Sequence, residues 1–250
     1  MKILVTNDDG IKSPGLHALC EALGQDHEVW TVSPAEEKSA TSHSITIRDA
    51  VRTARVEERL FSCWGTPVDC VLLAVNGLVP VTIEFVISGI NLGANCGSDI
   101  IFSGTAAAAR QAAMLGLPAV AVSINAFNGP FHFETATGFV VSNLDRFKSL
   151  WRGDHFLNIN VPNQSPEGVE AHMARPSMPV YEHSVHSFTS PSGDDYYVYS
   201  GAARPNPAES EEGEFESDTT LLHRGKITVS PIALFPSLAK SVKEYPSALF

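Results

Sequence analysis

The segment KILVTNDDG, residues 2–10, gives the clearest indication of architecture in this chain. Its first part, Lys2 to Thr6, is a short apolar run with β-branched residues, which is typical of a strand buried on both faces of a parallel sheet. Two adjacent carboxylates, Asp8 and Asp9, follow directly. Because ligands of parallel α/β sheets bind beyond the carboxyl ends of the strands, this position predicts a polar site.

Strand-like and helix-like segments alternate through the first 164 residues. We expect strands at residues 2–6, 28–33, 83–88, 119–124 and 156–161. We expect helices at residues 16–23, from Thr66 onward, at 105–115 and at 133–150. This alternation predicts an α/β fold in which a mostly parallel sheet is covered by helices on both faces.

The composition changes after Pro162. Residues 165–216 are rich in Pro, Ser, Gly and acids, with strand-like pieces such as YYVYS. We therefore divide the chain into a catalytic core at 1–164 and an extension at 165–250. We expect the extension to be β-rich and to form a hairpin used in oligomer contacts. Its last part, about 219–250, contains a late strand-like run and is expected to return to the core.

The composition also excludes several classes of protein. The net charge of −11 argues against a surface for polymeric nucleic acid. No apolar run approaches the roughly 20 residues that span a bilayer, so we expect no membrane partner. The four cysteines lack the C-x-x-C spacing of zinc sites, and no secretory segment is visible at the N-terminus. A cytoplasmic location is expected.

The Asp8–Asp9 pair is the first candidate for chemistry. Adjacent carboxylates after a buried strand repel each other and resist desolvation. A hard cation such as Mg²⁺ or Mn²⁺ removes that cost, because it binds carboxylate oxygens while keeping several waters. The alternative is a simple turn in which one aspartate caps the following helix. On this loop alone, both interpretations stay open.

Two more polar loops follow predicted strands. The second loop carries Ser39, which is a neutral oxygen ligand if it is functional, and His43, which is then an acid or a hydrogen-bond donor to phosphate. An ordinary polar loop with a packing histidine is the alternative. The third loop carries Asn91 and Asn95 and ends in Ser103–Thr105, which opens an alanine-rich helix. A helix N-terminus with nearby hydroxyl groups suits a phosphate. Ordinary N-capping by Ser103 or Thr105 is the alternative.

Together the three loops place a cation site and a phosphate site at one edge of the predicted sheet. This combination favours metal-assisted phosphoryl transfer, in which the cation polarises the phosphate and lowers the pKa of a water molecule. It matches neither a P-loop nor a G-x-G-x-x-G motif.

The same residues resemble a known family. The strings ILVTNDDGIKSPG, SATSHSIT, GTPVDCV, VISGINLGAN and FSGTAAAAR, in this order, look like the SurE family of nucleotidases. The similarity is close over about the first 125 residues, and NINVP and GKITVSPIAL also resemble family segments. Residues 165–216 match least, and no site residue is transferred from them.

The resemblance implies a Rossmann-like three-layer fold whose C-terminal extension helps to build a homodimer or homotetramer. It implies hydrolysis of nucleoside 5′- and 3′-monophosphates by a metal-activated water, with short-chain polyphosphate as a further substrate of some members. One divalent cation per subunit, Mg²⁺ or Mn²⁺, is implied as cofactor. The implied metal ligands are Asp8, Asp9, Ser39 and Asn91, of which Asp8 and Asp9 are also the catalytic residues. The implied substrate and phosphate neighbours are Asn95, Ser103, Gly104, Thr105 and His43.

This chain departs from the family pattern at several positions. Ala40 and Ser42 stand where glycine is usual, and Gln111 stands where an acid is common. None of these departures replaces a proposed ligand. A covalent aspartyl-phosphate enzyme is a different interpretation, but such enzymes place their carboxylates at alternate positions, whereas here they are adjacent. A nucleotide-sensing module that binds without turnover is the non-enzymatic alternative.

Overall fold

A computed structural model of the chain describes residues 1–204 and 214–236. Its strands are β1 (Lys2–Thr6), β2 (Glu28–Pro34), β3 (Thr53–Glu57), β4 (Leu60–Cys63), β5 (Phe85–Leu92), β6 (Ala119–Ile124), β7 (His155–Val161), β8 (Ala171–Met173), β9 (Val180–Thr189), β10 (Asp195–Arg204) and β11 (Ile227–Ala233). Its helices are α1 (Pro14–Leu23), α2 (Pro67–Leu73), α3 (Asp99–Phe102), α4 (Gly104–Met114), α5 (Phe133–Leu150) and α6 (Asp218–His223), with a π-helical turn η1 (Ala74–Leu78) after α2.

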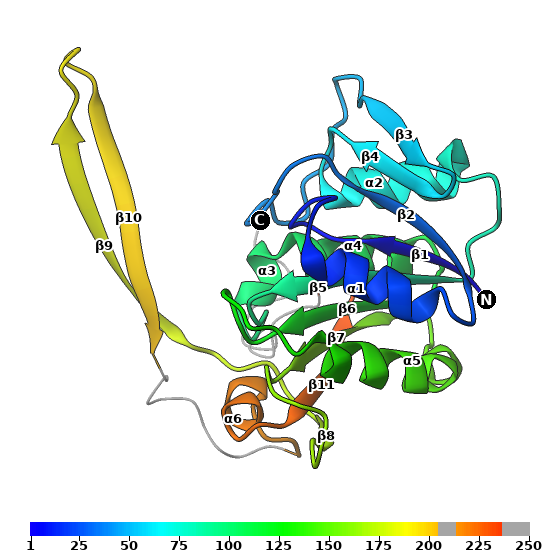
Figure 1. Cartoon of the computed structure of the whole chain (residues 1–250). Coiled ribbons are helices and arrows are strands. Elements are labelled where there is room, and N and C mark those ends of the chain that lie inside the picture. The colour runs from blue at the N-terminus through cyan, green and yellow to red at the C-terminus, as the bar shows by residue number, and fades with distance from the viewer. Residues whose placement is uncertain (205–213, 237–250) are drawn as a thin grey trace, which may run out of the picture.

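The described part of the chain has one large, mostly parallel sheet with the strand order β3-β4-β2-β1-β5-β6-β7-β11-β8 (Figure 1). β1 pairs in parallel with β2 on one side and with β5 on the other. The antiparallel pairs are β3 with β4, near one edge, and β11 with β7, near the other. The strand order reverses beside β1, which places a ligand-binding crevice at the carboxyl end of that strand. The predicted α/β class is confirmed.

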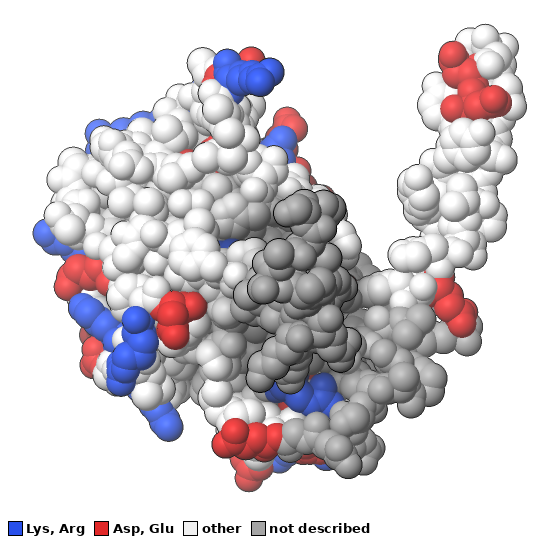
Figure 2. All heavy atoms as spheres, turned by 180° about the vertical axis from the view of Figure 1, so that it is seen from behind, with Lys and Arg blue, Asp and Glu red and all other residues white. Residues whose placement is uncertain are grey.

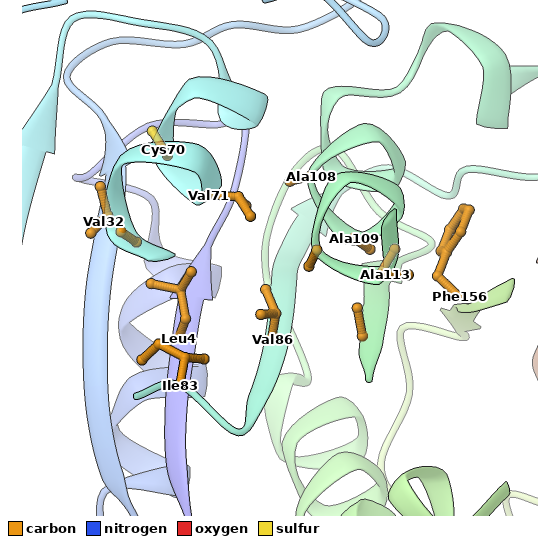
Figure 3. Packing of buried hydrophobic residues seen from close by; sticks show 14 of the residues in the cluster. Leu4, Val32, Cys70, Val71, Ile83, Val86, Ala108, Ala109, Ala113 and Phe156 are labelled. Atoms are coloured by element: carbon orange, nitrogen blue, oxygen red, sulfur yellow. The ribbon is translucent and has the colours of Figure 1, made fainter. Parts of the chain in front are cut away.

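Helices cover both faces of the sheet. α1 and α5 contact each other on one face, and α2 and α4 contact each other on the other (Figure 1). Successive residues of β1 alternate between the two layers: Ile3 and Val5 pack into the α1–α5 core, whereas Leu4 packs into the α2–α4 core. Figure 3 shows this second core, where the small side chains of α4 let the helix lie close to the sheet.

One strand differs from its expected bounds, and two strands were missed. The strand expected at residues 83–88 is β5, which begins at Phe85 and continues to Leu92. Its register with β6 shifts between Ser88 and Asn91, and pairing then resumes, so Asn91 lies on the strand and not in the loop. The strands β3 and β4 were not predicted. β3 is an edge strand that exposes charged residues, so it lacks the apolar alternation of a half-buried strand.

The C-terminal part contributes to the large sheet and also leaves it. β11 pairs with both β7 and β8, and α6 contacts β11. β9 and β10 form a separate antiparallel hairpin that projects from the body, as expected for this region (Figure 1). The division of the chain at residue 164 stays a prediction, and residues 237–250 lie outside the described residues. No helix in the described ranges combines the length and apolarity needed to cross a membrane.

Candidate active site

The turn after β1 is held by the buried side chain of Asn7. Its Nδ2 donates to the Gly10 carbonyl at 2.9 Å, and its Oδ1 accepts a hydrogen bond from Ser33 Oγ at 2.6 Å. Because Ser33 lies on the neighbouring strand β2, this pair of hydrogen bonds ties the turn to the sheet. Asp8 and Asp9 are thereby presented at the carboxyl end of β1.

Asp8 is anchored to the start of α4. Its Oδ2 accepts the Thr105 N–H at 3.0 Å, and its Oδ1 accepts a hydrogen bond from Thr105 Oγ1. A Cβ on Gly104 would lie 2.8 Å from Asp8 Cβ and 2.9 Å from Asp8 Oδ2, so this approach requires glycine. The positive end of α4 therefore stabilises the Asp8 carboxylate.

The two carboxylates disfavour each other's charge. Burial raises the pKa of Asp8, although hydrogen bonds from Thr105 oppose the rise. The pKa of Asp9 is raised to about 7, first by burial and then by the charge of Asp8, against a hydrogen bond from Leu92 N–H at 3.1 Å. Among the described residues, no Lys, Arg or His forms an ion pair with either carboxylate.

A pocket of about 230 Å³ opens beside this turn. Its lining brings together five of the predicted site residues, namely Asp8, Ser39, Asn91, Asn95 and Ser103. They come from segments that follow β1 and β2, from β5 itself, from the loop beyond it and from the start of α4. The expectation that separate polar segments converge at this edge of the sheet therefore agrees with the geometry.

Asn95 is held in place by side chains of the neighbouring strands β7 and β6. Its N–H donates to Asn160 Oδ1 at 2.8 Å, and its carbonyl accepts from Asn158 Nδ2 at 2.8 Å and from Asn160 Nδ2 at 3.1 Å. Its side-chain Nδ2 donates to Ser123 Oγ on β6 at 2.9 Å. Asn158, Asn160 and Ser123 are fully buried, so they hold the Asn95 main chain and side chain in one orientation.

Known proteins resemble this chain over most of its length. Residues 3–183 match the family described as Survival protein SurE. The chain belongs to the SurE family. It is 38% identical to the 5′-nucleotidase SurE of Geotalea uraniireducens over 94% of this chain and 93% of that one. It is 37% identical to the 5′-nucleotidase SurE of Pseudothermotoga lettingae over 94% of this chain and 90% of that one. It also resembles the crystal structure of the SurE protein from Aquifex aeolicus, with a TM-score of 0.82 and 30% identity over 98% of both chains.

In this SurE-family chain, the start of α4 has its donors engaged within the protein. Ser103 Oγ accepts the Ala106 N–H at 3.0 Å, which is the capping role considered as the alternative from sequence. Both the N–H and the hydroxyl of Thr105 bind Asp8, and Thr105 is fully buried. Ser103 still lines the pocket, whereas Gly104 and Thr105 contact Asp8 and are not part of the pocket lining. Their roles as direct phosphate neighbours stay predictions.

His43 is not brought to the pocket wall of this SurE-family member. Its Nε2 lies 3.0 Å from Gln111 Oε1 on α4, and it is absent from the pocket lining. The loop that carries it is held elsewhere, because Ser42 Oγ donates to the Ile101 carbonyl at 2.7 Å. Ala40 and Ser42, the two positions where glycine is usual, have positive φ values of 57° and 55°. A backbone of that kind explains why glycine suits these positions.

Asp99 and Phe127 are among the pocket residues that were not predicted from the sequence. Asp99 begins α3 within the Gly/Asn-rich loop, and Phe127 lies just beyond the carboxyl end of β6. The signal for Asp99 was an acid in a loop already singled out. The signal for Phe127 was its place after the fourth expected strand, residues 119–124, because ligands of parallel sheets bind beyond the carboxyl ends of the strands.

The residues present fit a hard divalent cation. Asp8 and Asp9 supply negative oxygens without a positive partner in the described structure. Asn91 uses its Nδ2 to bind the Gly93 carbonyl at 2.8 Å, which leaves its amide oxygen for another partner. Ser39 is exposed and donates to Glu37 Oε1 at 2.8 Å. No group of three His, Cys, Asp or Glu side chains gathers in the described ranges, so the site depends on two carboxylates with neutral oxygens, which suits Mg²⁺ or Mn²⁺.

Proposed function

We propose that this protein is a metal-dependent nucleotidase that hydrolyses nucleoside 5′-monophosphates to nucleoside and phosphate. The SurE-family relatives named 5′-nucleotidase support the reaction class, that of a phosphoric monoester hydrolase. The observation that carries the proposal is the pocket in which the buried Asp8, the amides of Asn91 and Asn95 and the capped start of α4 meet. Hydrolysis of 3′-monophosphates and of short-chain polyphosphate, and a cytoplasmic location, stay predictions.

The cation would be held by Asp8, Asp9, Ser39 and the Asn91 amide oxygen. When bound, a divalent cation there supplies positive charge against the phosphoryl oxygens and acidifies water. Thr105 keeps the Asp8 carboxylate facing the pocket through its two hydrogen bonds. One of the two aspartates would accept a proton from the attacking water as the water oxygen bonds to phosphorus. The proton would then pass to the ester oxygen as its bond to phosphorus breaks, which yields phosphate and the free nucleoside.

The phosphoryl group would be oriented by polar groups on the other side of the pocket. Asn158 and Asn160 hold the main chain of Asn95, and Ser123 accepts a hydrogen bond from its Nδ2, so the side chain needs little rearrangement to bind an oxygen. Ser103 caps α4 beside it and lines the same pocket.

We further propose that the protein assembles as a homodimer or homotetramer through the β9–β10 hairpin. Along the hairpin, Val185, Phe188, Tyr197 and Tyr199 are 56%, 57%, 63% and 77% exposed. Figure 2 shows mostly uncharged surface along this arm, with acidic residues at its tip. A two-stranded hairpin is only marginally stable alone, so an apolar arm of this kind is expected to pack against a second copy.

The test of the reaction is phosphate release from a panel of 5′- and 3′-nucleoside monophosphates. The protein is first treated with EDTA and then supplied with Mg²⁺ or Mn²⁺. We expect release of phosphate from at least one 5′-monophosphate after metal is added. If folded protein binds the nucleotides but releases no phosphate under any metal, the protein is a nucleotide-sensing module instead.

A further inference from the structure

A second and larger pocket adjoins the candidate active site. It measures about 410 Å³, compared with about 230 Å³ for the first. Ala94, Asp99 and Phe127 line both pockets, so the two are contiguous. A molecule with its phosphate in the first pocket would therefore extend into the second one.

The far wall of the second pocket comes from the C-terminal part of the chain. It includes Ser177 and Tyr181 at the base of the hairpin and Thr219 and His223 on α6. These residues lie outside the close sequence similarity used to assign the first pocket. The hairpin base and α6 thus supply side chains to a cavity beside residues of the N-terminal core.

Asp218 fastens this wall to the loop between β5 and α3, residues 93–98, which we call the site loop. This fully buried carboxylate accepts the Gly97 N–H at 2.8 Å through Oδ2 and the Ser177 N–H at 2.9 Å through Oδ1. A Cβ on Gly97 would lie 2.4 Å from the Ser177 carbonyl oxygen, so the two segments are in direct contact. The second pocket is therefore formed before any ligand arrives, which reduces the entropy lost on binding.

Two of the residues that the pockets share, Phe127 and Asp99, have side chains that suit a nucleoside. Phe127 is 76% exposed, and a Cβ on Gly93 would lie 2.3 Å from its ring, so the ring sits directly over the site loop. Asp99 stands where the pockets meet and accepts a hydrogen bond from the Tyr181 hydroxyl through Oδ1. A carboxylate repels a phosphate but accepts hydrogen bonds from a ribose diol. An exposed aromatic ring offers a stacking surface to a nucleobase.

We propose that the second pocket binds the nucleoside half of the substrate, with the ribose hydroxyls at Asp99 and the base against Phe127. The proposal rests on the nucleotidase function above and adds that the hairpin base and α6 take part in substrate recognition. Tyr181 orients Asp99, whereas Asp218 keeps the wall in place and touches no substrate.

The kinetic test compares 5′-AMP with p-nitrophenyl phosphate, which lacks both ribose and base. The readout is the ratio of kcat/KM for the two substrates. We expect Phe127→Ala and Asp99→Asn each to lower this ratio about tenfold. Phe235→Ala and Asp145→Asn are matched controls on exposed side chains that line neither pocket, and they should leave the ratio unchanged. An unchanged ratio in both pocket variants would overturn the assignment.

A binding test separates this proposal from the catalytic one. Adenosine, guanosine, cytidine and uridine are titrated by calorimetry into EDTA-treated protein, where no hydrolysis takes place. We expect at least one nucleoside to bind the wild type, to bind Phe127→Ala about tenfold more weakly and to bind Asp8→Asn equally well. Because Phe127 is mostly exposed, its loss should not unfold the protein. Equal binding to wild type and Phe127→Ala, or no binding by any nucleoside, contradicts the proposal. Absence of phosphate release with nucleoside binding intact contradicts only the nucleotidase function.

Discussion

Asp8 is the residue around which the candidate site is arranged. Only 4% of it is exposed, yet it carries a carboxylate next to a second one at Asp9. The protein offsets the cost of burying this charge with the start of α4, where Thr105 donates twice. A cation would offset the remaining repulsion. The same residue therefore lowers stability in the metal-free protein and is needed for the proposed reaction.

Asp8→Asn should separate these two effects. We expect metal-dependent phosphate release to fall at least about 100-fold, because the proposed cation loses a charged ligand. The free energy of unfolding in EDTA should change by less than about 1 kcal/mol, since lost hydrogen bonding is offset by relief of the repulsion from Asp9. Phosphate-release assays and denaturant unfolding measure the two quantities. Near-full activity in this variant would contradict the assignment of Asp8 as a metal ligand and catalytic residue.

Gly104→Ala should damage the site through packing alone. The new Cβ would overlap Asp8 Cβ at 2.8 Å, so Asp8 must shift or the start of α4 must open. We expect a loss of about 1–3 kcal/mol in unfolding free energy together with a large loss of activity. The matched control is Gly138→Ala on α5, where nothing lies within 4 Å of the added Cβ and stability should rise by about 0.5–1 kcal/mol. Equal effects of the two substitutions would contradict this account of Gly104.

At the scale of single elements, the short helix α2 ties the loop that carries Ser39 and His43 to the core. Asp69 closes a capping box with Thr66 and also accepts two hydrogen bonds from Thr46, at 3.0 Å from N–H and 2.7 Å from Oγ1. Burial alone would raise the pKa of Asp69, but the hydrogen bonds from Thr46 and Thr66 outweigh it and lower the pKa. The segment after His43 is thereby tied to the start of α2.

Asp69→Asn should make the free energy of unfolding less dependent on pH in the acidic range. A carboxylate whose pKa is lower in the folded state stabilises the protein above its unfolded pKa of about 3.9, and the contribution is lost as pH falls through the folded value. We expect the variant to be about 2 kcal/mol less stable at pH 7, with a difference that shrinks below about pH 4. Asp49→Asn, on an exposed loop, is the control and should show no such difference. Urea unfolding from pH 3 to 7 measures the difference in unfolding free energy between the wild type and Asp69→Asn. A difference that does not change with pH would rule out the charge of the Asp69 carboxylate as its cause.

Elements with a strong local pattern were predictable from the sequence. Helix α5 has the expected bounds, and the buried strands β1, β6 and β7 lie within a residue of theirs, because apolar runs and helix signals are encoded locally. The extension of β5 to Asn91 was not predictable, since it depends on pairing with β6 across a register shift. Likewise, the attachment of His43 to Gln111 depends on contacts between distant segments, which a single sequence does not reveal. The contribution of Tyr181 and His223 to a pocket was missed for the same reason.

At the scale of the whole molecule, the site lies where strand order reverses, and the C-terminal part is connected to it in two ways. β11 extends the large sheet, while Asp218 at the start of α6 binds the site loop through Gly97. The β9–β10 hairpin begins beside the second pocket and projects away from the body (Figure 1). Oligomer contacts along the hairpin would therefore lie on an arm whose base lines a substrate pocket.

Tyr197→Ser combined with Tyr199→Ser should weaken the proposed assembly. Both side chains point to the same face of β10, because residues two apart share a face, and both are more than half exposed. We expect the wild type to sediment as a dimer or tetramer and the double variant to shift toward the monomer. Val56→Ser, on the exposed edge strand β3, is the control for loss of an apolar surface residue. A monomeric wild type, or no shift in the double variant, would contradict a role of the hairpin in assembly.

The most direct test of the proposed function is the dependence of hydrolysis on the cation. EDTA-treated protein is freed of chelator and assayed for phosphate release from 5′-AMP, or from the 5′-monophosphate it prefers, while Mn²⁺ is added in steps. The proposal predicts no release without metal and a rise that saturates near one equivalent per chain. Undiminished hydrolysis in the presence of EDTA would contradict the assignment of Asp8 and Asp9 as the ligands of a required metal.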